Sequence, residues 1–238
     1  LDMDLLTRGA GFGYLGSTIT SLIYATFTFI FFALEAVIMA MALQLYFGLP
    51  LGLAYLISSL AIIPLVTFGV TLISRLQLWT QPLWLLLLVL PYAAIAIKDP
   101  GLYSNFITLS GSSEHSESFD WRLFGSASTV CFALAVQIGE QLDVLRFLPR
   151  KTRQNRWCWW AAVLIAGPGG IAPGMLKMLG GAFLAFVALQ MQVPADRALQ
   201  PTQMYLAGYG YVFTDMHWAL FATLLFVLVS QLKINVTN

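Results

Sequence analysis

One carboxylate lies deep inside a long apolar segment near the start of the chain. Glu35 is the single charged residue among residues 17–46, and four phenylalanines occur just before it in residues 27–32. A charge at membrane depth costs about 2.5–3.5 kcal/mol on insertion scales, so it indicates a function or a partner. A carboxylate accepts N–H donors and aromatic faces stack on planar rings. We expect Glu35 to bind a planar, NH-bearing ligand or, alternatively, to form a structural ion pair with Lys177 or Lys233.

Polar side chains also gather near the end of a later apolar segment, residues 122–146. They are Gln137, Glu140, Gln141 and Asp143. On a helix Gln137 and Glu140 share one face, and Asp143 faces Arg146 one turn later. Gln137 is therefore a candidate ligand-binding residue, and Asp143 with Arg146 a candidate structural pair. The plainer alternative is a solvated helix end.

The last apolar segment is unusually polar near its end, where Gln231, Lys233 and Asn235 occur. Lys233 either extends to the aqueous interface or has a buried role. The chain has no Gly-rich phosphate loop, no nucleophile elbow and no clustered metal ligands. We therefore expect no enzyme, no catalytic residue and no metal site within this sequence.

The composition predicts a helical membrane protein. Of the 238 residues 59% are hydrophobic and 10% are charged, whereas soluble domains contain about 25% charged residues. Five of the twelve Lys and Arg residues lie within residues 143–156, so the charge pattern indicates no nucleic-acid partner. The apolar runs are too long for barrel strands and do not alternate, which predicts an all-α polytopic fold in the lipid bilayer.

The apolar runs predict one transmembrane domain over residues 1–238, with both ends incomplete. A crossing needs about 20 apolar residues. Arg75 and Gln77 form a polar break between the second and third spans, and residues 157–191 are expected to cross once with an interrupted or interfacial first portion. The expected spans are residues 17–46, 51–73, 82–97, 122–146, 157–191 and 215–236.

Three short motifs follow one another along the chain. They are Arg8 with Phe12-Gly13 and Gly16-Ser17, then Asp143-x-x-Arg146-Phe147, and finally Ser230-Gln-Leu-Lys-Ile-Asn235. They resemble the entry of the third, the end of the sixth and the Asn-bearing eighth transmembrane helix of the nucleobase–cation symporter-1 family. That family includes purine, cytosine, allantoin and hydantoin permeases. The resemblance covers most of the chain, as helices three to eight.

This resemblance implies a fragment of a leucine-transporter-type fold with inverted repeats and a midplane site. It implies a domain of the bacterial inner membrane that binds or transports a nucleobase or a related planar heterocycle. By position, Phe31 and Glu35 match the family's stacking aromatic residue and its hydrogen-bonding glutamine. Glu35 is a departure, because an ionised carboxylate only accepts hydrogen bonds, so the choice of ligand could differ.

The eighth helix departs from the family as well. Hydroxyl residues normally precede the asparagine and help to bind sodium, but Lys233 and Ile234 precede Asn235 here. An ammonium can stand where sodium would sit, and isoleucine cannot coordinate the ion. Sodium coupling is therefore doubtful. Lys233 and Asn235 are the candidates for coupling to sodium or protons. No cofactor is expected. The last span also resembles permease-like modules of bacterial sensor histidine kinases, so a ligand-sensing input domain with cytoplasmic signalling domains in the same chain is the alternative.

The basic residues predict the topology. With six crossings, seven Lys and Arg residues fall on the side of residues 150–156 and three on the opposite side, so residues 150–156 are expected in the cytoplasm. Single cysteines introduced at Ser113 and Thr152 should react with an impermeant reagent from opposite membrane faces. Labelling of both from one face would contradict the six-crossing topology.

Overall fold

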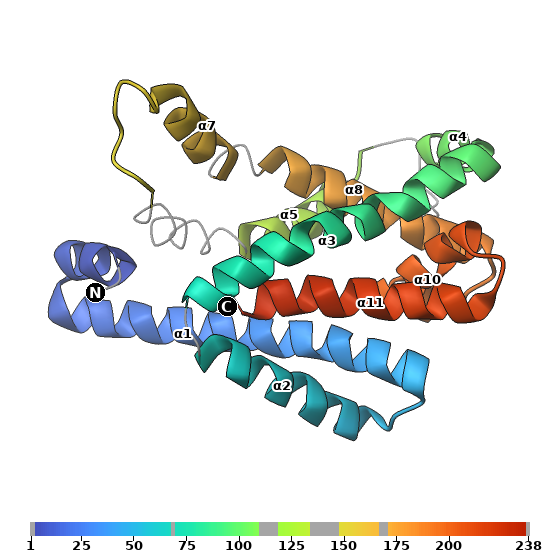
Figure 1. Ribbon diagram of the computed structural model, residues 1–238, viewed down its shortest axis with the longest axis horizontal. Coiled ribbons are helices and arrows are strands. Elements are labelled where there is room, and N and C mark those ends of the chain that lie inside the picture. The colour runs from blue at the N-terminus through green and yellow to red at the C-terminus, as the bar shows by residue number, and fades with distance from the viewer. Residues whose placement is uncertain (1–2, 68–69, 110–118, 134–147, 167–170, 237–238) are drawn as a thin grey trace. The chain divides into compact units, whose positions relative to one another are not determined.

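Helices form every element of the described part of the chain (Figure 1). The computed structural model describes residues 3–67, 70–109, 119–133, 148–166 and 171–236. This confirms the all-α prediction there, whereas the leucine-transporter-type repeat stays a prediction. The helices are α1 (Met3–Phe47), α2 (Leu51–Thr67), α3 (Val70–Lys98), α4 (Gly101–Ile107), α5 (Trp121–Ala133), α7 (Arg156–Ala166), α8 (Ile171–Gln190), α9 (Ala195–Ala198), α10 (Pro201–Val212) and α11 (Met216–Asn235).

Among the described residues, four helices are long and apolar enough to cross a membrane, which confirms the transmembrane character. They are Arg8–Phe47, Leu72–Lys98, Ala172–Gln190 and Met216–Asn235. The apolar helix Leu51–Leu65 is shorter. Of the expected span 122–146, only the part up to Ala133 is described. The six-crossing topology therefore stays a prediction.

Two of the expected spans differ in their details. The break at Arg75 and Gln77 is wrong, because α3 continues through both residues. The long segment 157–191 forms α7, which ends at Ala166, and α8, which begins at Ile171. Of these two helices only α8 reaches the length of a crossing.

The chain divides into two compact units, and the divisions fall within α1 and α8. The first unit contains Leu1–Phe27 and Ser110–Met178, and the second contains Thr28–Leu109 and Leu179–Asn238. The two units are described separately below. The single domain expected from the sequence stays a prediction.

In the first unit, α1 changes direction at Gly13. This residue has φ 68° and ψ −176°, a conformation that favours glycine because it has no Cβ. Arg8, which precedes the kink, contacts the helix that follows it. Its Nη1 atom donates to the Thr20 carbonyl at 3.4 Å, and its Cζ atom lies 4.6 Å from the Tyr24 ring centroid. The residues before Gly13 therefore fold back onto the helix that follows.

The second unit has its core where α10 and α11 pack on each other and on α3. Tyr209 is fully buried there, and its hydroxyl donates to the Leu87 carbonyl at 2.8 Å. Burial raises the pKa of Tyr209, so the phenol stays protonated and remains a donor. A second cluster surrounds Phe183 of α8, with the Tyr103 ring stacked on it at 4.3 Å between centroids.

Glycines allow three helices of this unit to approach closely. A Cβ on Gly208 of α10 would lie 2.8 Å from Pro91 Cβ and 3.0 Å from Leu184 Cδ2, on α3 and α8. A Cβ on Gly180 would lie 2.7 Å from the Tyr92 hydroxyl. Gly181 has no atom within 4 Å of such a Cβ. A packing role therefore fits Gly180 but neither Gly181 nor Gly13, which serves the kink.

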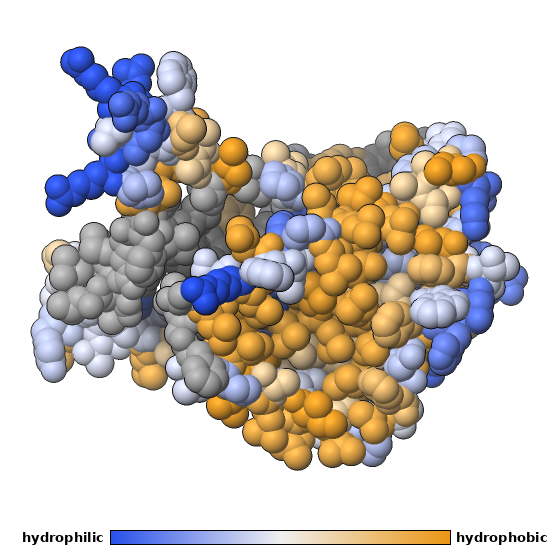
Figure 2. All heavy atoms as spheres, viewed as in Figure 1, coloured by the Kyte–Doolittle hydropathy of each residue, from blue (hydrophilic) through white to orange (hydrophobic). Residues whose placement is uncertain are grey.

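The outward faces of the second unit are apolar. Figure 2 shows apolar residues covering much of the face formed by α1, α2, α3 and α11. The exposed side chains include Leu56, Leu60 and Ile63 on α2 and Leu85, Leu86 and Val89 on α3. An apolar surface of this extent is unusual for a soluble monomer. It fits helices whose outer solvent is lipid.

The close approach at Gly208 predicts a contrast between two glycines on α10. Gly208→Ala should lower the free energy of unfolding by about 1–3 kcal/mol, because the new methyl group overpacks against Pro91 and Leu184. Gly210→Ala is the matched control, since its Cβ would meet only Met191 Cε at 3.6 Å and alanine favours helix. Thermal unfolding in detergent measures both, and equal melting temperatures would contradict the packing argument.

Candidate functional site

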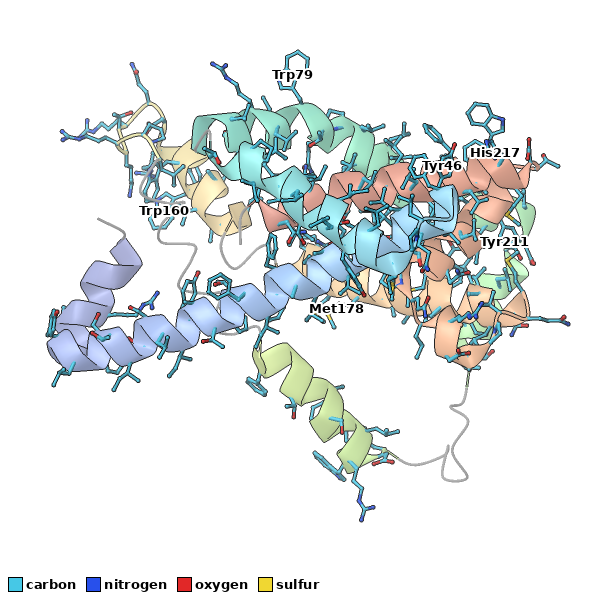
Figure 3. The ribbon with its side chains drawn as sticks, turned by 90° about the horizontal axis from the view of Figure 1, so that it is seen from below. Tyr46, Trp79, Trp160, Met178, Tyr211 and His217 are labelled. Atoms are coloured by element: carbon cyan, nitrogen blue, oxygen red, sulfur yellow. The ribbon has the colours of Figure 1, made fainter. Side chains whose placement is uncertain are left out.

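The described candidate residues lie on two helices of the second unit. Phe31 and Glu35 are half-buried on α1, and Lys233 and Asn235 are buried on α11. Tyr46 of α1 lies beside His217 of α11, with 5.7 Å between ring centroids (Figure 3). The two helices that carry the candidates are thus neighbours. Three further candidates, Gln137, Asp143 and Arg146, lie outside the described residues.

Four buried oxygen atoms of this unit have no hydrogen-bond partner among the described residues. They are Glu35 Oε2, Ser58 Oγ, Gln231 Oε1 and Asn235 Oδ1. Buried polar atoms are nearly always hydrogen-bonded, since leaving one unpaired costs about 1–3 kcal/mol. Their common occurrence on α1, α2 and α11 therefore indicates a site that a further group completes.

One contact joins α11 to α1 near these side chains. Asn235 Nδ2 donates to Met39 Sδ at 3.7 Å. Glu35 precedes Met39 by one helical turn on the same face of α1, as Gln231 precedes Asn235 on α11.

On α2, Ile62 packs with Met39 of α1 and with Val236, which follows α11. Ser58 lies one turn before Ile62 on the same buried stripe of α2. We call Glu35, Ser58, Gln231 and Asn235 the acceptor cluster. Sequence reasoning missed Ser58, because a single serine in an apolar helix carries no signal of burial.

The acceptor cluster has a clear chemical preference. Its unpaired atoms are one carboxylate oxygen, two amide oxygens and one hydroxyl oxygen. Amide and ionised carboxylate oxygens only accept hydrogen bonds, so three of the four need a donor or a cation. Phe31 is four residues from Glu35, which places its ring on the same face of α1. The arrangement can hold a flat group that carries several N–H donors.

Lys233 faces the opposite side of α11, toward α3. Its Nζ donates to Gln81 Oε1 at 2.5 Å and to the Gln77 carbonyl at 3.2 Å. Gln77 Nε2 in turn donates to the Lys233 carbonyl at 2.7 Å. The Trp84 ring centroid lies 5.6 Å from the ammonium, within the range of a cation–π interaction.

These contacts decide between the two expectations for Lys233. Its exposed fraction is 9%, so the side chain is buried and does not extend to an aqueous surface. Whether Glu35 pairs with Lys177 or Lys233 stays a prediction, and its Oε2 atom has no hydrogen-bond partner among the described residues. Sequence reasoning missed Gln77 and Gln81 as partners, although their spacing of four places both on one face of α3.

Comparisons with known proteins identify no family. No family model matches the chain, and neither a curated protein nor a solved structure matches it. Among the described residues, no three His, Cys, Asp or Glu side chains gather in a way that could hold a metal ion. The functional argument therefore depends on the acceptor cluster itself.

The contacts of Lys233 predict a loss of stability on its replacement. Lys233→Met should lower the free energy of unfolding by about 1.5–3 kcal/mol, because Gln81 Oε1 loses a donor and a charged hydrogen bond disappears. Lys98→Met removes the same charge from an exposed position at the end of α3 and should have little effect. Size-exclusion chromatography of heated, detergent-solubilised samples compares them, and equal losses in both variants would contradict this role.

Proposed function

We propose that this chain is a permease-like membrane domain whose acceptor cluster, with Phe31, binds a nucleobase or a related planar heterocycle. The observation that carries the proposal is the buried, unpaired carboxylate oxygen of Glu35. Asn235, whose amide oxygen is also unpaired, contacts Met39, one helical turn after Glu35 on α1. The motif resemblance in the sequence supports the same ligand class independently of this geometry.

The chemistry of such a ligand matches the side chains. Nucleobases and hydantoins carry ring and exocyclic N–H groups in one plane, and a carboxylate accepts two of them in a charge-assisted pair. An aromatic ring on the same helix face can stack on the ligand plane. Three of the four unpaired oxygens only accept hydrogen bonds, which favours donor-rich ligands and agrees with glutamate at position 35.

For the coupling residues we retain Lys233 and Asn235, which lie on different faces of α11. Lys233 binds Gln77 and Gln81, whereas Asn235 reaches Met39. A lysine ammonium on the same helix as Asn235 supports binding that needs no sodium ion. Ile234 contributes no oxygen ligand, which supports the same conclusion.

The proposal predicts that Glu35 determines affinity. Glu35→Ala should weaken binding by roughly 10- to 150-fold, because a charged hydrogen bond contributes about 1.5–3 kcal/mol. Glu35→Gln should retain part of the affinity because it keeps one acceptor oxygen. Gln44→Ala, an exposed position on the same helix, is the control.

Calorimetry with a panel of purines, pyrimidines and hydantoins measures these affinities. Unchanged binding by a correctly folded Glu35→Ala protein would return Glu35 to a structural role. Uptake of the same ligand into proteoliposomes, with sodium or choline outside, separates transport from sensing. Binding without uptake would favour the sensor alternative.

A further inference from the structure

A cationic, tryptophan-rich segment lies in the first unit, separate from the acceptor cluster. Its described residues, 148–166, contain four cations, Arg150, Lys151, Arg153 and Arg156, and no acidic residue. All four cations are exposed. The tryptophans at positions 157, 159 and 160 follow directly in α7. The segment therefore combines positive charge with large amphipathic rings.

Hydrogen bonds hold the loop before α7 in one conformation. Asn155 Oδ1 accepts from the Thr152 backbone N–H at 2.6 Å, and Asn155 Nδ2 donates to the Arg150 carbonyl at 3.0 Å. Trp159 Nε1 donates to the Pro149 carbonyl at 3.0 Å. The loop is thus fixed to the first turn of the helix, so its cations have defined positions.

Two of the four cations lie over tryptophan rings. Lys151 Nζ is 4.6 Å from the Trp160 ring centroid and 5.5 Å from that of Trp159. Arg156 Cζ is 5.6 Å from the Trp157 ring centroid. Figure 2 shows hydrophilic side chains gathered over the loop before α7, and Figure 3 places Trp160 on that helix. Charge and ring thus occur together on one surface.

The helix itself is suited to a membrane surface. With 11 residues its length is about 16 Å, too short to cross a bilayer. Its apolar side chains are nevertheless exposed, among them Trp157 at 78% and Ile165 at 71%. Tryptophan is enriched where hydrocarbon meets the headgroups, and exposed cations there attract anionic lipids.

We propose that residues 149–160 bind the headgroups of anionic phospholipids, with α7 lying in the membrane interface. The phosphates contact Lys151, Arg153 and Arg156, and the tryptophan rings enter the region between headgroup and acyl chain. A soluble phosphate would use the cations but gain nothing from the exposed rings. The charge and the rings together therefore identify a lipid. This site is independent of the proposed heterocycle site.

Native mass spectrometry of the full chain can test the site with phosphatidylglycerol and phosphatidylcholine as probes. Lys151→Gln/Arg153→Gln/Arg156→Gln should weaken phosphatidylglycerol retention at least about tenfold, since each interfacial cation contributes roughly fivefold. The control Lys98→Gln/Arg122→Gln/Arg197→Gln removes three exposed cations elsewhere and should retain the lipid. Equal retention by both variants, equal loss by both, or displacement of the lipid by inorganic phosphate would overturn the proposal.

A second measurement does not depend on removing charge. Cys158 is exposed on α7, and a spin label there in a Cys131→Ser chain reports depth through its accessibility to oxygen and to a water-soluble nickel complex. In vesicles of phosphatidylcholine mixed with anionic phosphatidylglycerol, the label should lie near the level of the lipid phosphates. A label fully in water, or one near the bilayer centre, would contradict the interfacial placement.

Discussion

Lipid offers no hydrogen bonds, so polar groups on membrane helices must find partners within the protein. The contact between α3 and α11 follows this constraint. Lys233 and two glutamines satisfy one another across a distance of more than 150 residues in the sequence. At the contact between α10 and α3, the Tyr209 hydroxyl donates to the Leu87 carbonyl of α3. Polar contacts thus fix which faces of these helices meet, because apolar surfaces alone would pack equally well against lipid.

The junction of α1, α2 and α11 departs from that constraint. It keeps four buried oxygens without donors among the described residues, whereas the Lys233 ammonium and the Tyr209 hydroxyl each donate to a carbonyl of α3. Asn235 makes only a weak contact with the Met39 sulfur there. The free-energy cost of these unpaired oxygens is offset when a bound molecule donates hydrogen bonds to them. This contrast within one compact unit supports a binding site more strongly than any single residue type.

The sequence was sufficient to predict the all-α fold and several of the buried polar residues. It was insufficient to predict which residues those polar groups contact. Glu35, Lys233 and Asn235 stood out because charge and amide groups are costly in apolar helices. Gln77 was assigned to a break between spans, because a local pattern does not reveal that Lys233 would satisfy it. Gly13 was noted as part of a motif, but its role in the kink was not predicted, because it depends on a positive φ that composition does not encode. Gln137, Asp143 and Arg146 lie outside the described residues, so their roles stay predictions.

The absence of a side chain at Gly208 has a consequence for how the second unit moves. Its α-carbon allows Pro91 of α3 and Leu184 of α8 to approach within a distance that excludes even a methyl group. Helices in such intimate contact resist sliding, because any shift would bring a neighbouring, larger residue to the same place. We therefore expect the parts of α3, α8 and α10 that surround Gly208 to move together rather than to slide past one another.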